Sequence, residues 1–340
     1  MRIIRIEEAE NSVCCHDITK IIPGEFKGCA FKKGHVITRE DIPKLRKLGK
    51  EHIYIWEAQQ GKVHENEAAI RMANAVKGYG VGYSEPVEGK VSLIAQYEGL
   101  CVINEAALLR VNMIGDVMIA TRSNLKLVRK GDVIAGLRAI PLAIEEKILE
   151  QVEEVCKDIE LITVKPLYSL QTYVVTTGNE VYSGLIQDKF GPFLQTKLPQ
   201  YGCSIVEQQI VPDDVNIIAK VIQEIADKGA ELIVTTGGMS VDPDDVTPLG
   251  IRKSGATVVS QGSPVLPGAM LLIAYLGDIP ILGLPGGIMY SKTSVLDLVL
   301  PLLTARQNIT REQIAKFGLG GLCLQCTTCH YPVCPFGTGA

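Results

Sequence analysis

This sequence lacks a large excess of either acidic or basic residues. Its 340 residues include 34 Lys and Arg against 38 Asp and Glu, which gives a formal net charge of −4. A balance of this kind creates no field that would draw the chain to nucleic acid. We therefore expect no nucleic-acid partner.

Long hydrophobic runs are also missing. One of the longest, residues 270–276, is too short to cross a bilayer. The amino-terminal stretch becomes acidic at Glu7 and Glu8, where a secretory signal would need an apolar centre. The sequence thus predicts no membrane partner and a cytoplasmic location.

The composition is that of an ordinary globular protein, with 46% hydrophobic and 21% charged residues, and the length allows two or three domains. We predict a small α+β unit over residues 1–60 and a β-rich α+β region with a connector helix over 61–165. Residues 166–310 are predicted to form an α/β domain, and residues 311–340 a Cys-rich metal-binding tail.

The predicted α/β domain alternates apolar strands with helices. Strands are expected near residues 173–175, 204–206, 232–234, 258–259, 271–274 and 281–282, and helices near 188–198, 214–228, 247–253 and from 291 toward 303. This alternation predicts βαβ units, and hence a three-layer α/β/α sandwich with a mainly parallel sheet.

Three of these strands end in glycine loops. Residues 176–180 read Thr-Thr-Gly-Asn-Glu, residues 235–240 read Thr-Thr-Gly-Gly-Met-Ser, and residues 283–287 read Gly-Leu-Pro-Gly-Gly. Glycine lets the backbone approach a ligand, and free N–H groups with Thr and Ser hydroxyls can bind phosphate. One such loop is more often an ordinary turn. Three at strand ends, where open α/β sheets bind ligands, indicate a site for an anionic ligand.

Carboxylates follow the first two loops. Asp188 comes after the first, and Asp242, Asp244 and Asp245 come after the second. Mg²⁺ is typically held by one or two carboxylates together with phosphate oxygens and water. The sequence therefore predicts Mg²⁺ beside the bound phosphate.

The motifs as a set resemble a known family. In order they are Thr177-Gly178-Asn179-Glu180, Asp188 with Gly191-Pro192, Val211-Pro212-Asp213-Asp214, Thr236-Gly237-Gly238-Met239-Ser240, Asp245-Val246-Thr247 and Leu284-Pro285-Gly286-Gly287. This order is similar to that of the molybdopterin-binding domain family, which includes molybdopterin molybdenumtransferases and molybdopterin adenylyltransferases. The resemblance implies a three-layer α/β/α domain that binds molybdopterin or adenylated molybdopterin.

The resemblance also implies roles for individual residues. The cofactor-binding set is Thr177, Gly178, Glu180, Thr236, Gly237, Gly238, Ser240, Pro285, Gly286, Gly287 and Ser291. Asp188 and Asp245 are the implied catalytic carboxylates, and Asp242 and Asp245 the implied Mg²⁺ ligands. One departure is clear, because residues 267–270 read Pro-Gly-Ala-Met where molybdenumtransferases usually have Pro-Gly-Lys-Pro.

The sequence contains 10 cysteines, and the last of them are clustered. Cys323, Cys326, Cys329 and Cys334 form the pattern C-x2-C-x2-C-x4-C-P. This pattern resembles the bacterial ferredoxin run, which binds an iron–sulfur cluster, while a four-thiolate Zn²⁺ site and a disordered reduced tail are the alternatives. Gly318, Gly320 and Gly321 predict a flexible joint before this tail, so that it would be a separable metal module.

Together these features predict a protein of molybdenum cofactor biosynthesis. Its small-molecule partners would be molybdopterin and molybdate, and we expect a homo-oligomer, either a dimer or a trimer. Molybdenumtransferase-like metal insertion is the leading hypothesis. The alternative is a non-catalytic carrier or sensor of molybdopterin whose cysteine tail binds metal or responds to redox state.

Overall fold

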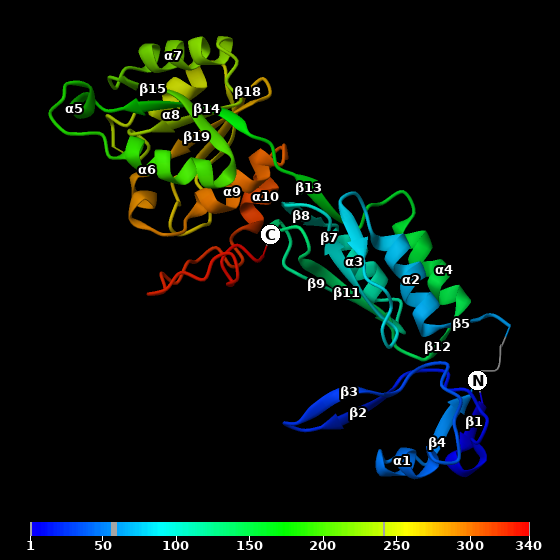
Figure 1. Ribbon diagram of the computed structural model, residues 1–340. Helices are drawn as coiled ribbons and strands as arrows, with labels where there is room; N and C mark the ends of the chain where they lie inside the picture. Colours follow the sequence, from blue (N-terminus) through cyan, green and yellow to red (C-terminus); the bar gives the residue numbers. More distant parts are fainter. Residues whose placement is uncertain (1, 56–59, 241, 340) are drawn as a thin grey trace. The chain divides into compact units, whose positions relative to one another are not determined.

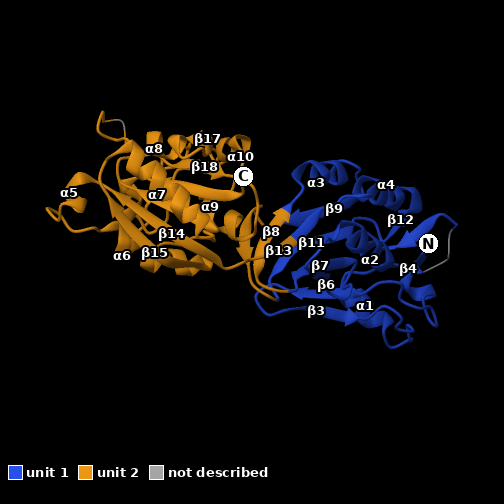
Figure 2. Cartoon of the chain, turned by 90° about the horizontal axis from the view of Figure 1, so that it is seen from above, with its two compact units in different colours: residues 1–96, 103–121, 131–163 blue, residues 97–102, 122–130, 164–340 orange. Residues whose placement is uncertain are grey.

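The computed structural model describes residues 2–55, 60–240 and 242–339. The chain divides into two compact units, which Figure 2 shows in different colours. The first unit comprises residues 1–96, 103–121 and 131–163, and the second comprises residues 97–102, 122–130 and 164–340. No helix within the described ranges is long and apolar enough to cross a membrane.

The amino-terminal part of the first unit is a small α+β structure. Its elements are β1 (Arg2–Arg5), η1 (Ile6–Glu8), β2 (Ile18–Ile22), β3 (Phe26–Phe31), α1 (Ile42–Lys47) and β4 (His52–Ile55). Strand β1 pairs with β4, and β2 pairs with β3, both antiparallel. Ile6, Ile37 and Leu45 are fully buried and belong to the core of this part.

The rest of the first unit combines helices with antiparallel strands. The helices are α2 (Glu65–Val76), α3 (Glu105–Asn112) and α4 (Glu146–Cys156). A four-stranded sheet has the order β6 (Val81–Tyr83), β7 (Lys90–Ala95), β11 (Val133–Ala139) and β9 (Val117–Thr121), and β5 (Lys62–His64) pairs with β12 (Ala143–Glu145). A separate three-stranded sheet, most of which belongs to the second unit, has the order β10 (Lys126–Val128), β8 (Gly99–Ile103) and β13 (Ile162–Pro166).

The second unit is built on a six-stranded sheet. Its order is β15 (Cys203–Val211), β14 (Leu170–Thr177), β16 (Leu232–Thr236), β19 (Ile279–Leu284), β18 (Leu272–Leu276) and β17 (Thr257–Gln261). The first four strands are parallel, whereas β18 runs antiparallel to both of its neighbours. The prediction of a mixed α/β chain is confirmed, but the sheet is mixed, since the short turn between β18 and β19 can join only antiparallel strands.

Helices pack on both faces of this sheet, as Figure 1 shows for α7 on one side and for α6 and α9 on the other. The helical elements are α5 (Asn179–Tyr182), α6 (Phe190–Lys197), η2 (Leu198–Tyr201), α7 (Val215–Asp227), α8 (Thr247–Lys253), η3 (Gly286–Tyr290), α9 (Val295–Thr304) and α10 (Arg311–Lys316). Val174 of β14 packs in a core with α6 and α9, and Val175 packs in another with α7 and α8. Successive strand residues point to opposite faces, so each face has its own core.

The carboxyl-terminal tail packs against the rest of the second unit. The Leu266 N–H donates to Gly321 O and the Cys323 N–H donates to Leu266 O, each at 2.8 Å. Phe336 is buried in the same core as Phe317. A Cβ on Gly321 would lie 2.4 Å from the Pro264 carbonyl oxygen. The expected flexible joint at Gly318, Gly320 and Gly321 is therefore wrong, because main-chain segments pack too closely there for a side chain.

Candidate ligand site at the carboxyl edge of the sheet

The three glycine loops leave the sheet at neighbouring positions. Thr176 of β14 pairs with Thr236 of β16, and Thr236 pairs with Leu284 of β19. Because these strands are parallel, Gly178, Gly237 and Pro285 follow them at the same edge. This is the edge at which open α/β sheets bind ligands.

The first two loops are locked together by their own packing. Gly237 has a φ of +85°, and a Cβ there would lie 2.1 Å from the Thr177 carbonyl oxygen. Gly238 has a φ of +51°, and its Cβ would lie 2.8 Å from Thr247 Oγ1. The buried Thr177 and Thr247 hydroxyl oxygens are 2.8 Å apart. These glycines are required by the fold whether or not a ligand binds.

The threonine hydroxyls predicted to bind a ligand make hydrogen bonds between the loops in this structure. Thr236 Oγ1 donates to Thr176 Oγ1 at 3.2 Å, and both hydroxyls are buried. Thr177 is bonded to Thr247 in the same way. Ser240, at the end of the second loop, is exposed.

The first loop is tied to the end of the neighbouring strand β15. The Asn179 N–H donates to Asp213 Oδ2 at 2.8 Å, and the Asp213 N–H donates back to Asn179 Oδ1 at 3.2 Å. Asp213 Oδ1 is buried and, among the described residues, has no hydrogen-bond partner. Gly178 is buried, with a φ of +139°, and the exposed Glu180 follows it in α5. Asp213 was visible in the sequence only as part of the Val-Pro-Asp-Asp motif.

The Asp188 carboxylate accepts hydrogen bonds from nearby backbone N–H groups. Its Oδ1 accepts the Phe190 N–H at 2.8 Å, and its Oδ2 accepts the Gly191 N–H at 2.9 Å. The Gln208 side-chain amide donates to the same Oδ2 at 2.6 Å and to Thr176 Oγ1 at 2.9 Å. These bonds join the start of α6 to the end of β14, which is what a positioning residue does.

The carboxylates of the second loop are less committed. Asp245 is half-buried and Asp242 is exposed. Asp245 Oδ2 accepts the Asp242 N–H at 3.2 Å. The Asp245 Cα is 3.6 Å from the position a Cβ would take on Gly238. The Asp245 side chain therefore lies directly beside the second loop and keeps lone pairs that accept no hydrogen bond from the described residues.

The third loop differs from the second. Gly286 and Gly287 begin η3 and are exposed, and neither has a positive φ. A Cβ on either glycine would meet no atom within 4 Å. The fold itself therefore does not require glycine here, and Pro285 and the two glycines leave open space above the end of β19.

The segment after the third loop forms one wall of a cavity of about 330 Å³. Residues 290–293 line one side, and the tail, residues 322–327, 329–331 and 334–336, lines the other. Lys292 Nζ donates to the Thr327 carbonyl oxygen at 2.8 Å, and Thr293 Oγ1 lies 3.1 Å from Cys329 Sγ. Hydrogen bonds from Thr293 and from the Tyr331 backbone lower the pKa of Cys329. Ser291, a predicted ligand-binding residue, is half-buried in this wall.

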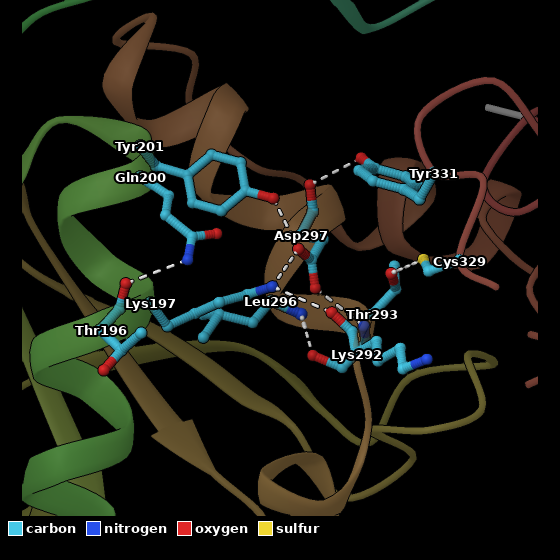
Figure 3. Close-up of polar contacts among 11 residues, drawn as sticks. Thr196, Lys197, Gln200, Tyr201, Lys292, Thr293, Leu296, Asp297, Cys329 and Tyr331 are labelled. Carbon is cyan, nitrogen blue, oxygen red and sulfur yellow. Dashed lines mark hydrogen bonds and ion pairs between the residues drawn. The ribbon is translucent and has the colours of Figure 1, made fainter. Parts of the chain in front are cut away.

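A buried ion pair supports this wall (Figure 3). Lys197 Nζ of α6 lies 2.5 Å from Asp297 Oδ1 of α9, and the Tyr201 hydroxyl donates to the same oxygen at 2.5 Å. The Tyr331 hydroxyl of the tail donates to the Asp297 carbonyl oxygen at 3.0 Å. Burial and the adjacent Asp297 carboxylate raise the pKa of Tyr201, so its hydroxyl stays a donor. The network joins α6, the start of α9 and the tail.

The expected metal cluster in the tail is not assembled. Within the described residues, no three His, Cys, Asp or Glu side chains lie together in a way that could hold a metal ion. The cavity is lined by all four tail cysteines, Cys323, Cys326, Cys329 and Cys334, but their side chains do not form such a group. In this arrangement the Cys329 side chain contacts Thr293, and the backbone of Cys323 is bonded to Leu266.

Residues 173–305 match a family model described as a probable molybdopterin-binding domain. The second unit thus contains a segment that matches this family, and the match covers less than half of the chain. Residues 3–57 match a second model, a domain of unknown function.

The relatives match only part of this chain. The molybdopterin molybdenumtransferase of Synechococcus elongatus is 28% identical over 160 residues, which cover 44% of this chain and 40% of the relative. A CinA-like protein of Mycobacterium avium is 35% identical over 79 residues, which cover 23% of this chain and 18% of the relative. The chain thus spans less than half the length of these relatives.

Among solved structures, the molybdopterin biosynthesis enzyme MoaB of Thermus thermophilus is similar to the chain. It is 23% identical and covers 42% of this chain and 98% of its own, with a TM-score of 0.34. The tungsten-cofactor-synthesizing protein MoaB of Pyrococcus furiosus is 20% identical and covers 39% of this chain, with a TM-score of 0.26.

Proposed function

We propose that the second unit binds molybdopterin or adenylated molybdopterin at the carboxyl edge of β14, β16 and β19, as part of molybdenum cofactor biosynthesis. One observation carries the proposal: three parallel strands of a domain of this family deliver glycine loops side by side. Helices on both faces of the sheet support a three-layer α/β/α arrangement of the domain.

The ligand's phosphate is proposed to lie against the backbone N–H groups of the loops. Such groups bind oxyanions well, because they are fixed in place and need no counter-ion. Ser240 and Ser291 add hydroxyls, and Glu180 stands at the rim. Asp213 adds a buried carboxylate oxygen that is free to accept a hydrogen bond.

Asp242 and Asp245 are the proposed Mg²⁺ ligands. They fit the ion's preference for one or two carboxylates with phosphate oxygens and water, because each side chain keeps free lone pairs beside the second loop. Bound Mg²⁺ would neutralise phosphate charge. Asp188, which was predicted to be catalytic, is proposed to act as a positioning residue through Gln208 and α6.

Calorimetric titration of the full chain with adenylated molybdopterin, with and without Mg²⁺, tests the site. Asp245→Asn should remove the Mg²⁺-dependent part of the affinity. The matched control is Asp278→Asn, an exposed carboxylate in the turn before β19, at the opposite edge of the sheet. Equal Mg²⁺-dependent binding by wild type and Asp245→Asn would refute the assignment.

Gly286→Val tests close approach of the ligand to the third loop. The side chain fits the free protein, because no atom lies within 4 Å of the added Cβ. We expect the thermal unfolding midpoint to stay the same. The affinity should fall by about 10-fold or more, which corresponds to a loss of about 1.4 kcal/mol or more of binding free energy. Unchanged affinity would place the ligand elsewhere.

The finer proposal is molybdenumtransferase-like metal insertion. Incubation with adenylated molybdopterin and molybdate should then release AMP and yield the metallated cofactor. A carrier or sensor role is the second candidate, favoured by two observations. Ala269 stands where a lysine is usual in molybdenumtransferases, and Lys292 is held by the tail. Saturable binding without AMP release would select this candidate.

Light scattering of the purified chain tests the proposed dimer or trimer.

A further inference from the structure

We propose that the cavity between residues 290–293 and the tail is a site for a thiophilic metal, with the thiols of Cys323, Cys326, Cys329 and Cys334 as its ligands. All four line this one cavity, and His330 lines it too. Ser291 borders both this cavity and the proposed phosphate site, but the ligands proposed here are thiols, so this proposal does not rest on the proposed function.

The frame of the cavity is fixed at both ends of the cysteine segment. At the first end, Cys323 follows the main-chain bridge between Leu266 and Leu322. At the other end, Phe336 is buried and its carbonyl oxygen accepts a hydrogen bond from Lys126 Nζ at 2.8 Å. The spacing of the anchors holds all four thiols near one space, which a free tail would not do.

Between these anchors the chain can adjust. Residues 324–330 are exposed and contain neither helix nor strand. The side chains of this segment can rearrange without disturbing the main core, because none of them belongs to it. The lack of a ready-made metal cluster therefore reflects the side-chain positions of this segment, while the backbone already surrounds the site.

The wall opposite the cysteines is suited to support thiolates. Thr293 Oγ1 lies 3.1 Å from Cys329 Sγ, and hydrogen bonds to ligand sulfurs are one way in which proteins tune such sites. Lys292 Nζ holds the Thr327 carbonyl oxygen at 2.8 Å, between two of the cysteines, and its positive charge offsets that of thiolates. Both contacts would stabilise thiolates bound to a metal.

The cavity volume favours a metal with several sulfur ligands. At about 330 Å³ it is far larger than one ion requires, since a water molecule takes about 30 Å³. It leaves room for four converging side chains around an ion, or for a small cluster. Zinc and cobalt are soft enough to prefer thiolates and serve as probes.

The test uses the full chain, reduced and stripped of metal under anaerobic conditions. Titration with Co²⁺ should produce the near-ultraviolet sulfur-to-cobalt charge-transfer band with saturation at about one equivalent, and Zn²⁺ should displace the cobalt. The double variant Cys326→Ser, Cys329→Ser should lose affinity by more than about 100-fold. Circular dichroism of this variant establishes that the second unit is still folded.

The matched control is Cys29→Ser, which removes an exposed thiol outside the tail and should leave the titration unchanged. Stoichiometric iron and sulfide in protein purified without oxygen would identify a cluster at the same thiols and also support the site. Binding well below one equivalent, or equal binding by wild type and the double variant, would overturn it. Because the probe is metal alone, a failure to bind molybdopterin leaves this result intact.

Discussion

Replacing Asp297 with asparagine tests the ion pair that supports the cavity wall. Its carboxylate faces Lys197, and the two side chains are only 3% and 11% exposed. The same carboxylate accepts the Tyr201 hydroxyl and, through Oδ2, the Ser294 N–H at 2.8 Å, which completes the capping box of α9. The amide oxygen of asparagine can keep one of these bonds, but the charge is lost.

The expected cost follows from burial. Removing one partner of a buried ion pair leaves the other charge without compensation and costs about 3–5 kcal/mol. The double variant Lys197→Met, Asp297→Asn removes both charges and keeps an oxygen for Tyr201 or Ser294. It should therefore recover about 2 kcal/mol relative to Asp297→Asn alone, because neutral replacement of a buried pair is often tolerated.

Urea unfolding followed by circular dichroism measures these differences. The matched control is Glu224→Gln, which removes the partner of Lys220 in an exposed pair 3.5 Å apart. That change should cost no more than about 0.5 kcal/mol, because exposed pairs are screened by water. The reasoning fails if Asp297→Asn costs as little as Glu224→Gln, or if the double variant is less stable than Asp297→Asn.

Two further predictions concern the tail and a buried thiol. Gly321→Val should detach the tail, because a Cβ there would lie 2.4 Å and 2.5 Å from two carbonyl oxygens. Chymotrypsin should then cleave within residues 322–336 at least about 10-fold faster than in the wild type. The control variant Gly287→Ala should leave the cleavage rate unchanged. Burial raises the pKa of Cys203 from 9.0 to about 12, so the native thiol keeps its proton where the unfolded thiol loses it, and stability should fall by about 1.4 kcal/mol between pH 8 and pH 10 from this group. Cys203→Ala should lack this share of the decline in urea unfolding, and an identical slope in both proteins would contradict the assignment.

Local patterns in the sequence predict much of the second unit. Helix α8 covers residues 247–253 as expected, and α7 starts after Asp214, whose side chain accepts the Asn216 and Ile217 N–H groups. Strands β14, β16 and β19 lie where apolar runs precede the glycine loops. These features depend on neighbours in the sequence, such as caps, turns and apolar periods, which a single chain displays.

The tail and the role of Asp188 could not be predicted in this way. The contact of Lys126 with Phe336 joins positions 210 residues apart, and glycines that allow close packing look the same in a sequence as glycines of a flexible linker. An Asp shortly before a helix can bind a ligand or satisfy the first N–H groups of that helix. The hydrogen bonds from Phe190 and Gly191 are visible only in the structure.

The unequal packing of the glycine loops bears on how this domain evolves. Gly237 is fixed by the Thr177 carbonyl oxygen 2.1 Å from any added Cβ, so a descendant that had lost every ligand would still retain glycine at this position. Gly286 has no such neighbour within 4 Å, and without a ligand it would drift freely among small and large residues. Among related sequences, invariance at position 286 is thus a record of selection for binding, whereas invariance at position 237 records only selection for the fold.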